Sequence, residues 1–116
     1  LKIAYRVVDI CTADMGFAAA AQVDLEAWFP ARRAFVETHS TSNTTDFQTR
    51  RLSTRFRSAS GHPALVHAVN GTGYAIQRTL AALLETHQQE DGTVVLPPVL
   101  REFFGSRARL HPPARQ

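Results

Sequence analysis

The chain has 116 residues, of which 44% are hydrophobic and 20% charged, a composition that indicates one globular domain or part of one and excludes an intrinsically disordered chain. No apolar run is long enough to cross a membrane, and the N-terminus lacks the basic and then apolar pattern of a secretory signal. The 13 basic and 10 acidic residues give a formal charge of +3, which favours anionic partners only mildly.

The cysteine content predicts the cellular compartment, and the first residue bears on whether the chain is part of a longer protein. Its one cysteine, Cys11, excludes an internal disulfide, so we expect a cytoplasmic protein. Leu1 opens the chain without a methionine, at the threshold of a strand. We therefore expect a piece of a longer protein or a truncated gene product.

The first half of the chain predicts three strands. Residues 4–11 are β-rich, residues 12–17 form a turn, and residues 18–21 form a loop or a short helical turn. Residues 23–30 alternate between apolar and polar, so we expect a strand with one face in the core and a polar face that is a candidate for function. A short link joins it to a third strand over 34–40, which predicts antiparallel pairing of the two. The expected core face holds Val23, Leu25, Ala27 and Phe29, and the polar face holds Asp24, Glu26 and Trp28.

The second half predicts mainly helices. Thr45 or Asp46 is expected to cap a helix that runs to about Arg57, with a solvent-facing basic side, followed by a loop to residue 63. A strand over 64–70 then leads into a helix over 73–89. The apolar stripe expected on this helix comprises Ile76, Leu80, Leu83, Leu84 and His87. A short strand over 93–95, a short helix to about Phe104 and a disordered tail over 106–116 complete the prediction.

The join between the strand over 64–70 and the helix after it is a candidate anion site. Gly71 and Gly73 precede a helix that carries Arg78, and a glycine turn at a helix start exposes backbone N–H groups. An arginine adds a planar fork of donors suited to phosphate oxygens. A dinucleotide fingerprint is excluded, because Ile76 stands where a third glycine is required. The alternative interpretation is a tight turn followed by a surface arginine.

This join resembles motif 3 of the class II aminoacyl-tRNA synthetases, and residues 1 to about 105 resemble the C-terminal part of a seryl-tRNA synthetase catalytic core. Many short segments match in the same order and spacing, which is more specific than any single motif. They are Tyr5–Val8, Asp14–Gly16, Gln22–Glu26, Glu37–Ser40 with Ser42, Asp46–Gln48 with Arg50 and Arg51, Leu65–His67, Asn70–Gly73 with Arg78, Leu84–Glu85, His87–Gln88, Asp91–Gly92 and Val95–Leu100.

The resemblance implies an α+β fold, in which an antiparallel β-sheet is flanked by helices. It also implies a serine–tRNA ligase, in which the carboxylate of serine attacks the α-phosphorus of ATP, pyrophosphate leaves, and the seryl group passes to tRNA. Positioning and charge stabilisation carry most of such chemistry. The implied partners are L-serine, ATP, Mg²⁺ and the serine tRNA, without a membrane, and the full-length protein is expected to be a homodimer.

The resemblance also implies site residues. Arg78 is the expected phosphate clamp and Glu37 the second catalytic residue, and both belong to the expected ATP site. Glu37 and Ser40 are the implied magnesium ligands, which requires the strand to end or kink at His39, because strict alternation puts them on opposite faces. The expected ATP site comprises Glu37, Thr38, His39, Ser40 and Arg78, and the expected serine pocket comprises Asn70 and Thr72.

Plainer interpretations stand beside these roles. Glu37 alone is also a solvated strand residue, His39 a hydrogen-bonded structural histidine, and Asn70 before glycine a turn residue. The 116 residues lack the segments that match motif 1, motif 2 and the tRNA-binding helical arm, so we expect no activity from this polypeptide alone. A truncated, inactive binding or regulatory module and a ligase that charges a carrier protein or a small metabolite are the alternatives.

Overall fold

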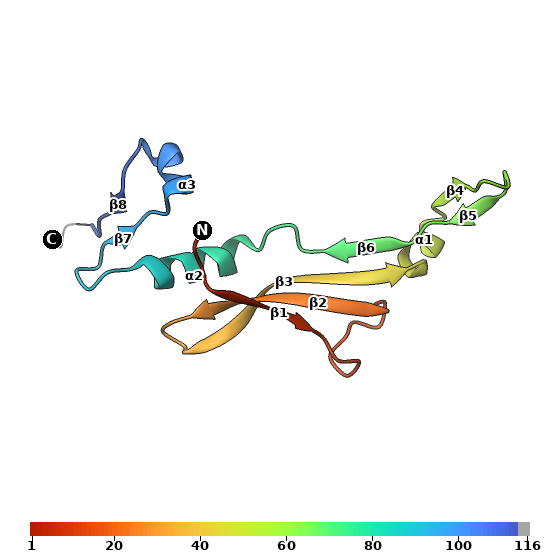
Figure 1. Ribbon diagram of the computed structural model, residues 1–116, viewed down its shortest axis with the longest axis horizontal. Helices are drawn as coiled ribbons and strands as arrows, with labels where there is room; N and C mark the ends of the chain where they lie inside the picture. Colours follow the sequence, from red (N-terminus) through yellow and green to blue (C-terminus); the bar gives the residue numbers. More distant parts are fainter. Residues whose placement is uncertain (114–116) are drawn as a thin grey trace. The chain divides into compact units, whose positions relative to one another are not determined.

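The computed structural model describes residues 1–113 as strands joined by short helices and turns (Figure 1). Within this part, no helix has the length and apolarity that a bilayer crossing requires. The strands are β1 (Tyr5–Asp9), β2 (Ala21–Phe29), β3 (Ala34–Thr45), β4 (Arg55–Arg57), β5 (Pro63–Leu65), β6 (Ala68–Gly71), β7 (Val94–Val95) and β8 (Arg109–Leu110). The helices are α1 (Phe47–Arg51), α2 (Ile76–His87), α3 (Pro98–Arg101) and a 3-10 turn over Glu102–Phe104.

The main sheet has four strands in the order β1-β2-β3-β6. Trp28 N–H donates to Ala4 O and Ile10 N–H donates to Gln22 O, so β1 and β2 run in opposite directions. A short turn returns β2 into β3, and β3 pairs antiparallel with β6. The expected antiparallel sheet is therefore confirmed. Two smaller sheets, β4-β5 and β7-β8, each have two strands.

The chain divides into two compact units, and the long strands contribute to both. The first unit holds residues 1–6, 27–36 and the chain from Ala75 onward, and the second holds residues 7–26 and 37–74.

The core of the first unit forms where α2 packs on the strands. Ala27, Phe29 and Ala82 are buried together, and Ile3 and Val36 pack against them. Two polar contacts fix the helix further: Ala31 N–H donates to Glu85 Oε2 at 3.0 Å, and His87 Nε2 lies 2.9 Å from Leu1 O.

The buried face of α2 differs from the predicted stripe. Thr79, Ala82 and Leu83 are buried, whereas Ile76 and Leu80 are 65% and 53% exposed. Ala82 is fully buried because its small side chain lets the helix approach the strand that carries Phe29. The helix also begins three residues later than expected, at Ile76, and ends at His87.

The alternation predicted for β2 holds in only one of the two units. Ala27 and Phe29 are buried as expected in the first unit. In the second unit Val23 and Leu25 are 37% and 38% exposed, while Asp24 is 6% exposed and accepts a hydrogen bond from Gln22 Nε2. The carboxylate that was expected to line a polar face is thus a buried, hydrogen-bonded group.

The helix predicted to run to Arg57 is wrong beyond its first turns. Helix α1 ends at Arg51, Ser53 adopts a positive φ of 55°, and the chain then forms β4, which pairs with β5. The single strand expected over 64–70 is correspondingly two strands in two sheets, β5 and β6. The alternating Arg-Phe-Arg of β4 favours a strand, and sequence periodicity alone did not separate it from the helix before it.

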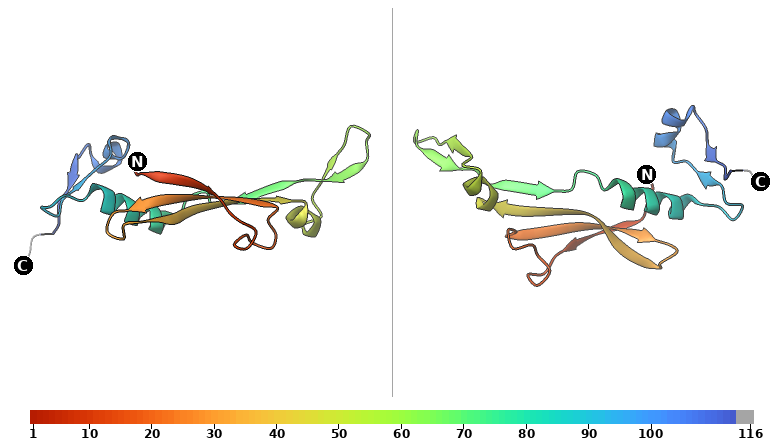
Figure 2. Two further views of the ribbon diagram at one scale, coloured as in Figure 1. Left: turned by 60° about the horizontal axis from the view of Figure 1, so that its bottom comes forward. Right: turned by 180° about the vertical axis from the view of Figure 1, so that it is seen from behind.

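The C-terminal segment of the first unit is ordered through β8. The short strand and helix expected over 93–104 are observed as β7, α3 and the 3-10 turn. After Gly105 the sequence predicted a disordered tail, but β8 pairs with β7 through Val94 and Leu110, and Leu96 N–H donates to Ala108 O (Figure 2). Residues 114–116 of the expected tail lie outside the described residues.

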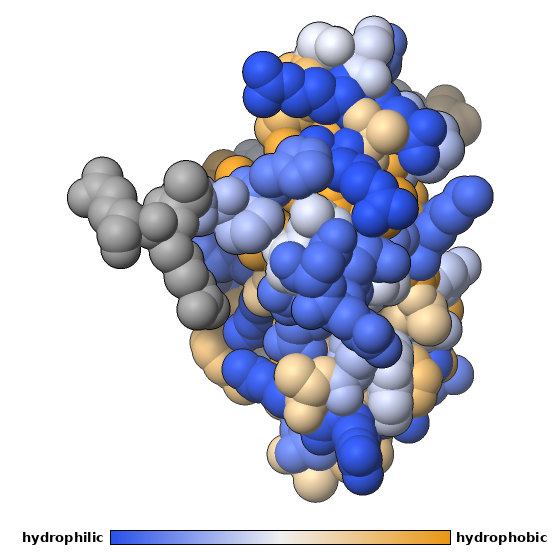
Figure 3. Space-filling view, turned by 90° about the vertical axis from the view of Figure 1, so that its left-hand side faces the viewer, coloured by the Kyte–Doolittle hydropathy of each residue, from blue (hydrophilic) through white to orange (hydrophobic). Residues whose placement is uncertain are grey.

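Two surface features complete the description of the first unit. Figure 3 views the face on which the C-terminal strands lie, and hydrophilic side chains cover most of it, with hydrophobic surface only in patches. At the turn before β7, the Thr93 hydroxyl and then the Thr93 N–H donate to Asp91 Oδ1 at 2.7 and 2.9 Å. These hydrogen bonds hold the pKa of Asp91 below its ordinary value.

Candidate functional site

The pairing of β3 with β6 brings three of the predicted site residues together in the second unit. The register places Thr41 opposite Gly71 and Ser42 opposite Asn70. One step further, Thr72 N–H donates to Ser40 O at 2.9 Å. Ser40, Asn70 and Thr72 therefore lie side by side at one end of a strand pair.

Gly71 is a strand residue, and the close approach of β3 explains why it is glycine. A Cβ at this position would lie 2.8 Å from Thr41 Oγ1 and 3.3 Å from Ser40 O. Gly73, by contrast, has open space where a Cβ would lie, and its φ is not positive. The two glycines of the G-x-G pattern thus do different things, and Thr72 to Ala75 separate Gly71 from the start of α2.

Asn70 is likewise a strand residue, so the turn interpretation of Asn-Gly does not apply. Its Nδ2 donates a long hydrogen bond of 3.4 Å to Gln48 Oε1, on α1. The Asn70 and Thr72 side chains are both exposed, which leaves them open to a small polar ligand.

Thr38 and His39 form a hydrogen-bonded chain that starts in the sheet. The Thr38 hydroxyl is buried and donates to Leu25 O at 3.1 Å, so it has no second proton to give. His39 Nδ1, 2.9 Å from the same hydroxyl oxygen, is therefore the donor of that contact. The His39 ring therefore carries a proton on Nδ1.

Tyr74 is a neighbour of the site that sequence reasoning missed. Its ring meets the His39 ring edge-to-face with centroids 5.8 Å apart. An aromatic residue directly after the G-x-G pattern was the available signal. The contact fixes the plane of the imidazole that Thr38 already orients.

Glu37 precedes this chain on β3 and is half-buried. In a regular strand, Glu37 and His39 project to one face and Thr38 and Ser40 to the other. The 2.9 Å contact between the neighbouring Thr38 and His39 side chains indicates that this alternation is relaxed here. The strand nevertheless continues to Thr45, so the expected end or sharp kink at His39 is absent.

Arg78 belongs to the first unit, unlike the other predicted site residues. It is the third residue of α2, and its side chain is exposed on a helix whose buried face holds Thr79, Ala82 and Leu83. The structure therefore brings Glu37, Thr38, His39, Ser40, Asn70 and Thr72 into one unit and places Arg78 on the helix of the other.

The donor set of the strand site is suited to a hard cation, although it makes no complete metal centre. Among residues 1–113, no three His, Cys, Asp or Glu side chains gather as metal ligands do. Glu37 and Ser40 supply the carboxylate and hydroxyl oxygens that Mg²⁺ accepts, and Mg²⁺ commonly takes its remaining ligands from phosphates and water. The oxygen chemistry of these residues thus fits a magnesium ion that arrives with a nucleotide, and because β3 neither ends nor sharply kinks at His39, one ion meets both side chains only through the relaxed alternation at Thr38 and His39.

The family of the chain follows from comparison with known proteins. Residues 1–87 match the family described as tRNA synthetase class II core domain (G, H, P, S and T), and the chain belongs to this family. Its antiparallel sheet and its G-x-G strand followed by α2 agree with that assignment.

Proteins similar to this chain include serine–tRNA ligases. That of Burkholderia cenocepacia (strain HI2424) is 50% identical over 99% of this chain, which covers 27% of the relative. That of Rubrobacter xylanophilus is 55% identical over 90% of this chain and 25% of the relative. The chain thus spans about a quarter of the length of the relatives it matches.

Two solved structures share the fold. Seryl-tRNA synthetase from Pyrococcus horikoshii, complexed with ATP, superimposes with a TM-score of 0.90 at 48% identity and covers 97% of this chain and 25% of its own. The cytoplasmic serine–tRNA ligase from Naegleria fowleri, in complex with AMP, gives a TM-score of 0.82 at 38% identity and covers 92% of this chain and 25% of its own.

Proposed function

We propose that the chain forms part of the catalytic core of a serine–tRNA ligase. One observation carries the proposal: about half of the residues are identical to those of serine–tRNA ligases over nearly the whole chain. Adenine nucleotides bound to the two similar structures support ATP as a substrate. L-serine and the serine tRNA are the other proposed substrates, and we extend the proposal to a homodimer of the complete protein in the cytoplasm.

The reaction has two balanced steps. An oxygen of the serine carboxylate attacks the α-phosphorus of ATP, the bond to the bridging oxygen breaks, and pyrophosphate leaves with that electron pair. A hydroxyl of the terminal ribose of tRNA then attacks the carbonyl carbon of the seryl adenylate and loses its proton, the bond from that carbon to the phosphate oxygen breaks, and AMP leaves with that electron pair. The protein has no covalent role, so it acts by placing the reactants and stabilising charge.

Arg78 is the proposed clamp on the triphosphate. Its guanidinium is exposed on the first turn of α2, where a planar fork of donors and the positive end of the helix dipole both favour a phosphate. Thr38, His39 and Ser40 are the proposed strand contacts of ATP. His39 is held in place by its contact with the Thr38 hydroxyl and by the Tyr74 ring, which supports a fixed position for this contact.

Glu37 and Ser40 are the proposed ligands of Mg²⁺, which when bound neutralises charge on the phosphates. Asn70 and Thr72 are the proposed serine contacts, because an amide and a hydroxyl can pair with the substrate hydroxyl, and an alanine would leave them unpaired. Their exposed side chains, next to Ser40 on the β3–β6 pair, support this assignment.

The experiment is serine-dependent exchange of pyrophosphate into ATP by the complete protein encoded by the gene, followed by charging of serine tRNA. We expect Arg78→Ala to lower exchange by about a hundredfold or more, the scale for loss of a transition-state charge contact. Gln77→Ala, at the adjacent exposed position, is the matched control and should leave exchange within about twofold. Exchange at the wild-type rate in Arg78→Ala would remove the clamp from the proposal.

Further outcomes separate the parts of the proposal. Exchange with serine but no transfer to tRNA would indicate a different acceptor, and no exchange with any amino acid would refute the ligase. Glu37→Gln and Ser40→Ala should each raise the magnesium concentration needed for half-maximal exchange. If only Glu37→Gln does so, Ser40 is no ligand.

A further inference from the structure

The charges of the second unit are distributed unevenly along the chain. No Asp or Glu occurs between Asp46 and Glu85, and four arginines lie between Asp46 and His67. These four positive charges exceed the net charge of +3 of the whole chain. An uncompensated positive stretch of this kind raises the local concentration of anions.

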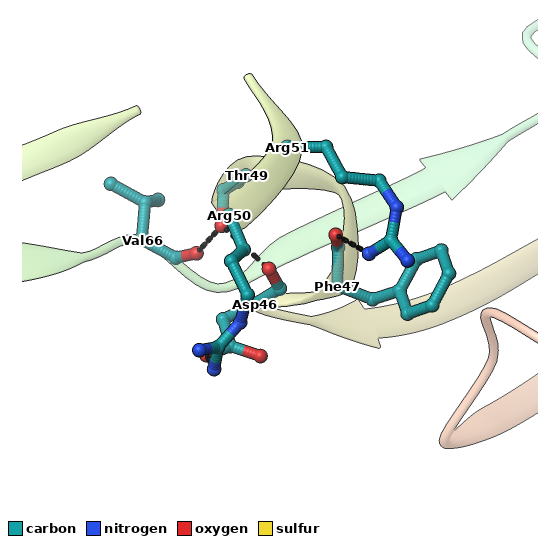
Figure 4. A network of polar contacts seen from close by, with 6 residues as sticks. All are labelled: Asp46, Phe47, Thr49, Arg50, Arg51 and Val66. Carbon is teal, nitrogen blue, oxygen red and sulfur yellow. Dashed lines mark hydrogen bonds and ion pairs between the residues drawn. The ribbon is translucent and has the colours of Figure 1, made fainter. Parts of the chain in front are cut away.

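The structure separates the four arginines into two pairs. On α1, Arg50 forms an ion pair with Asp46, and Arg51 lies 3.7 Å from the Phe47 ring centre and donates to Phe47 O at 3.0 Å (Figure 4). This pair is engaged locally. On β4, Arg55 and Arg57 are exposed, and Arg55 Nη1 donates to the backbone Ser53 O at 3.2 Å. Within residues 1–113 neither arginine forms an ion pair with an acidic side chain.

The second pair flanks an exposed aromatic ring. Arg55 and Arg57 are two positions apart on β4, so they project to the same face about 7 Å apart. Phe56, between them in the sequence, projects to the opposite face of the ribbon by the same alternation and is 52% exposed. A hollow of about 330 Å³ is lined by these three residues together with Gly61 and Pro63.

The strands that carry these residues form an arm, here named the basic hairpin (residues 54–66), that is fixed at its base. Thr49 is buried on α1, and its hydroxyl donates to Val66 O (Figure 4). Thr54 N–H donates to Thr49 O. Both ends of the hairpin are thus tied to one residue. Figures 1 and 2 show β4 and β5 extending from α1 as a ribbon separate from the four-stranded sheet.

The tip of the basic hairpin is also held by hydrogen bonds. Ser58 N–H donates to His62 O at 3.0 Å, the Ser58 hydroxyl donates to the same oxygen at 2.8 Å, and Gly61 N–H donates to Ser58 O at 2.9 Å. Gly61 has a positive φ of 82°, which this turn requires. An arm that is already ordered loses little conformational entropy when it binds.

We propose that the basic hairpin binds RNA, with Arg55 and Arg57 on backbone phosphates and Phe56 stacked against an unpaired base. Guanidinium groups bind phosphate oxygens through charge-assisted hydrogen bonds, and the exposed Phe56 ring on the other face of this two-stranded ribbon offers a stacking surface that any base can use. Strands of three residues offer too little area for a stable protein interface, and two arginines are fewer than the cluster of four or more typical of an anionic membrane site. The specific partner, serine tRNA, rests on the proposed function.

The test compares two double variants of the complete protein. R55Q/R57Q removes the proposed phosphate contacts, and R32Q/R33Q removes two exposed arginines from the turn between β2 and β3 as the matched control. Binding of serine tRNA is measured against salt concentration. We expect R55Q/R57Q to reduce the slope of log affinity against log salt by about 2, one unit for each contact, and R32Q/R33Q to leave the slope unchanged.

Further variants separate the contributions. R55K/R57K keeps the charges, so it should restore most of the salt slope, and Phe56→Leu should weaken binding about tenfold without changing the slope. Serine-dependent pyrophosphate exchange, which needs no tRNA, should stay at the wild-type rate in all of these variants. If R55Q/R57Q loses exchange through misfolding, R55K/R57K and Phe56→Leu decide the question.

Three results would overturn the proposal. The first two are an unchanged salt slope in R55Q/R57Q and a wild-type affinity for serine tRNA in Phe56→Leu. The third comes from a parallel measurement with phosphatidylserine vesicles: R55Q/R57Q loses binding to the vesicles while its binding to RNA stays intact. Failure of the proposed function can be told apart from failure of the RNA-binding proposal. If the complete protein shows no serine-dependent exchange but its RNA binding still depends on Arg55 and Arg57, the proposed function fails and the basic hairpin remains the RNA contact.

Discussion

The two glycines of the G-x-G pattern should respond differently to the same substitution. In Gly71→Ala the new methyl group would lie 2.8 Å from Thr41 Oγ1 and 3.3 Å from both Ser40 O and Thr41 Cβ. Thr41 is β-branched and has little rotamer freedom, and Ser40 O is backbone, so β6 itself must shift by a few tenths of an ångström. Overpacking of this kind costs about 1–3 kcal/mol of unfolding free energy.

Gly73→Ala is the matched control. Nothing lies within 4 Å of the new methyl group and φ is not positive, so the change in stability should be within about 1 kcal/mol and can be favourable. The assay is urea unfolding of both variants beside the wild type. Because Gly71 lies between Asn70 and Thr72, the shift of β6 should also raise the KM for serine in Gly71→Ala only.

A double variant tests the stated cause. Thr41→Ala removes the nearest atom, so Gly71→Ala in that background should cost less, with a coupling free energy of about 0.5 kcal/mol or more. Equal losses at Gly71 and Gly73, or a Gly71→Ala cost that Thr41→Ala does not change, would refute the reasoning from close strand approach.

Three other predictions follow from buried or hydrogen-bonded groups. Leu83→Ala should cost about 2–5 kcal/mol in urea unfolding and Leu80→Ala less than about 1, because Leu83 is 7% exposed and Leu80 53%; similar costs would contradict the observed burial of α2. Thr49→Val should cost about 1–3 kcal/mol and speed amide hydrogen exchange at the base of the basic hairpin, whereas Thr49→Ser keeps the hydroxyl and both properties. The pKa of Asp91 is lowered by hydrogen bonds from Thr93. The ionised carboxylate therefore contributes to the free energy of unfolding above pH 3.8, and this contribution is lost as the pH falls through the lower pKa of the folded state. Unfolding of Asp91→Asn at pH 7 and pH 3 should therefore show a smaller acid loss than wild type, and an equal loss would contradict the assigned role.

Local pattern was sufficient where an element depends mostly on its own residues. The strands of the β2–β3 hairpin were predicted from alternation and from a short link, and the short helix near Pro98 from proline at its start. The segment 47–57 shows the limit of this reasoning. Its apolar residues are compatible with a helix, and the break at Ser53 that ends α1 depends on Thr54 N–H binding back to Thr49 O.

The candidate site was predictable in part for a related reason. Collinear short segments predicted its strand residues, and the structure places Ser40, Asn70 and Thr72 next to one another on β3 and β6. The contact of Tyr74 with His39 and the proton position on that imidazole were not predictable. Both depend on contacts between side chains in the folded structure, and the spacing of residues along the sequence does not predict those contacts.

The sequence by itself determined the family and the antiparallel sheet, because these depend on residue order and on alternation along single segments. Tertiary structure alone decided which face of α2 is buried and why Gly71 must lack a side chain. The physical reason is that burial and close approach are properties of two elements at once. Ala82 is buried because Phe29 packs against it, and Gly71 is constrained because Thr41 lies directly opposite it.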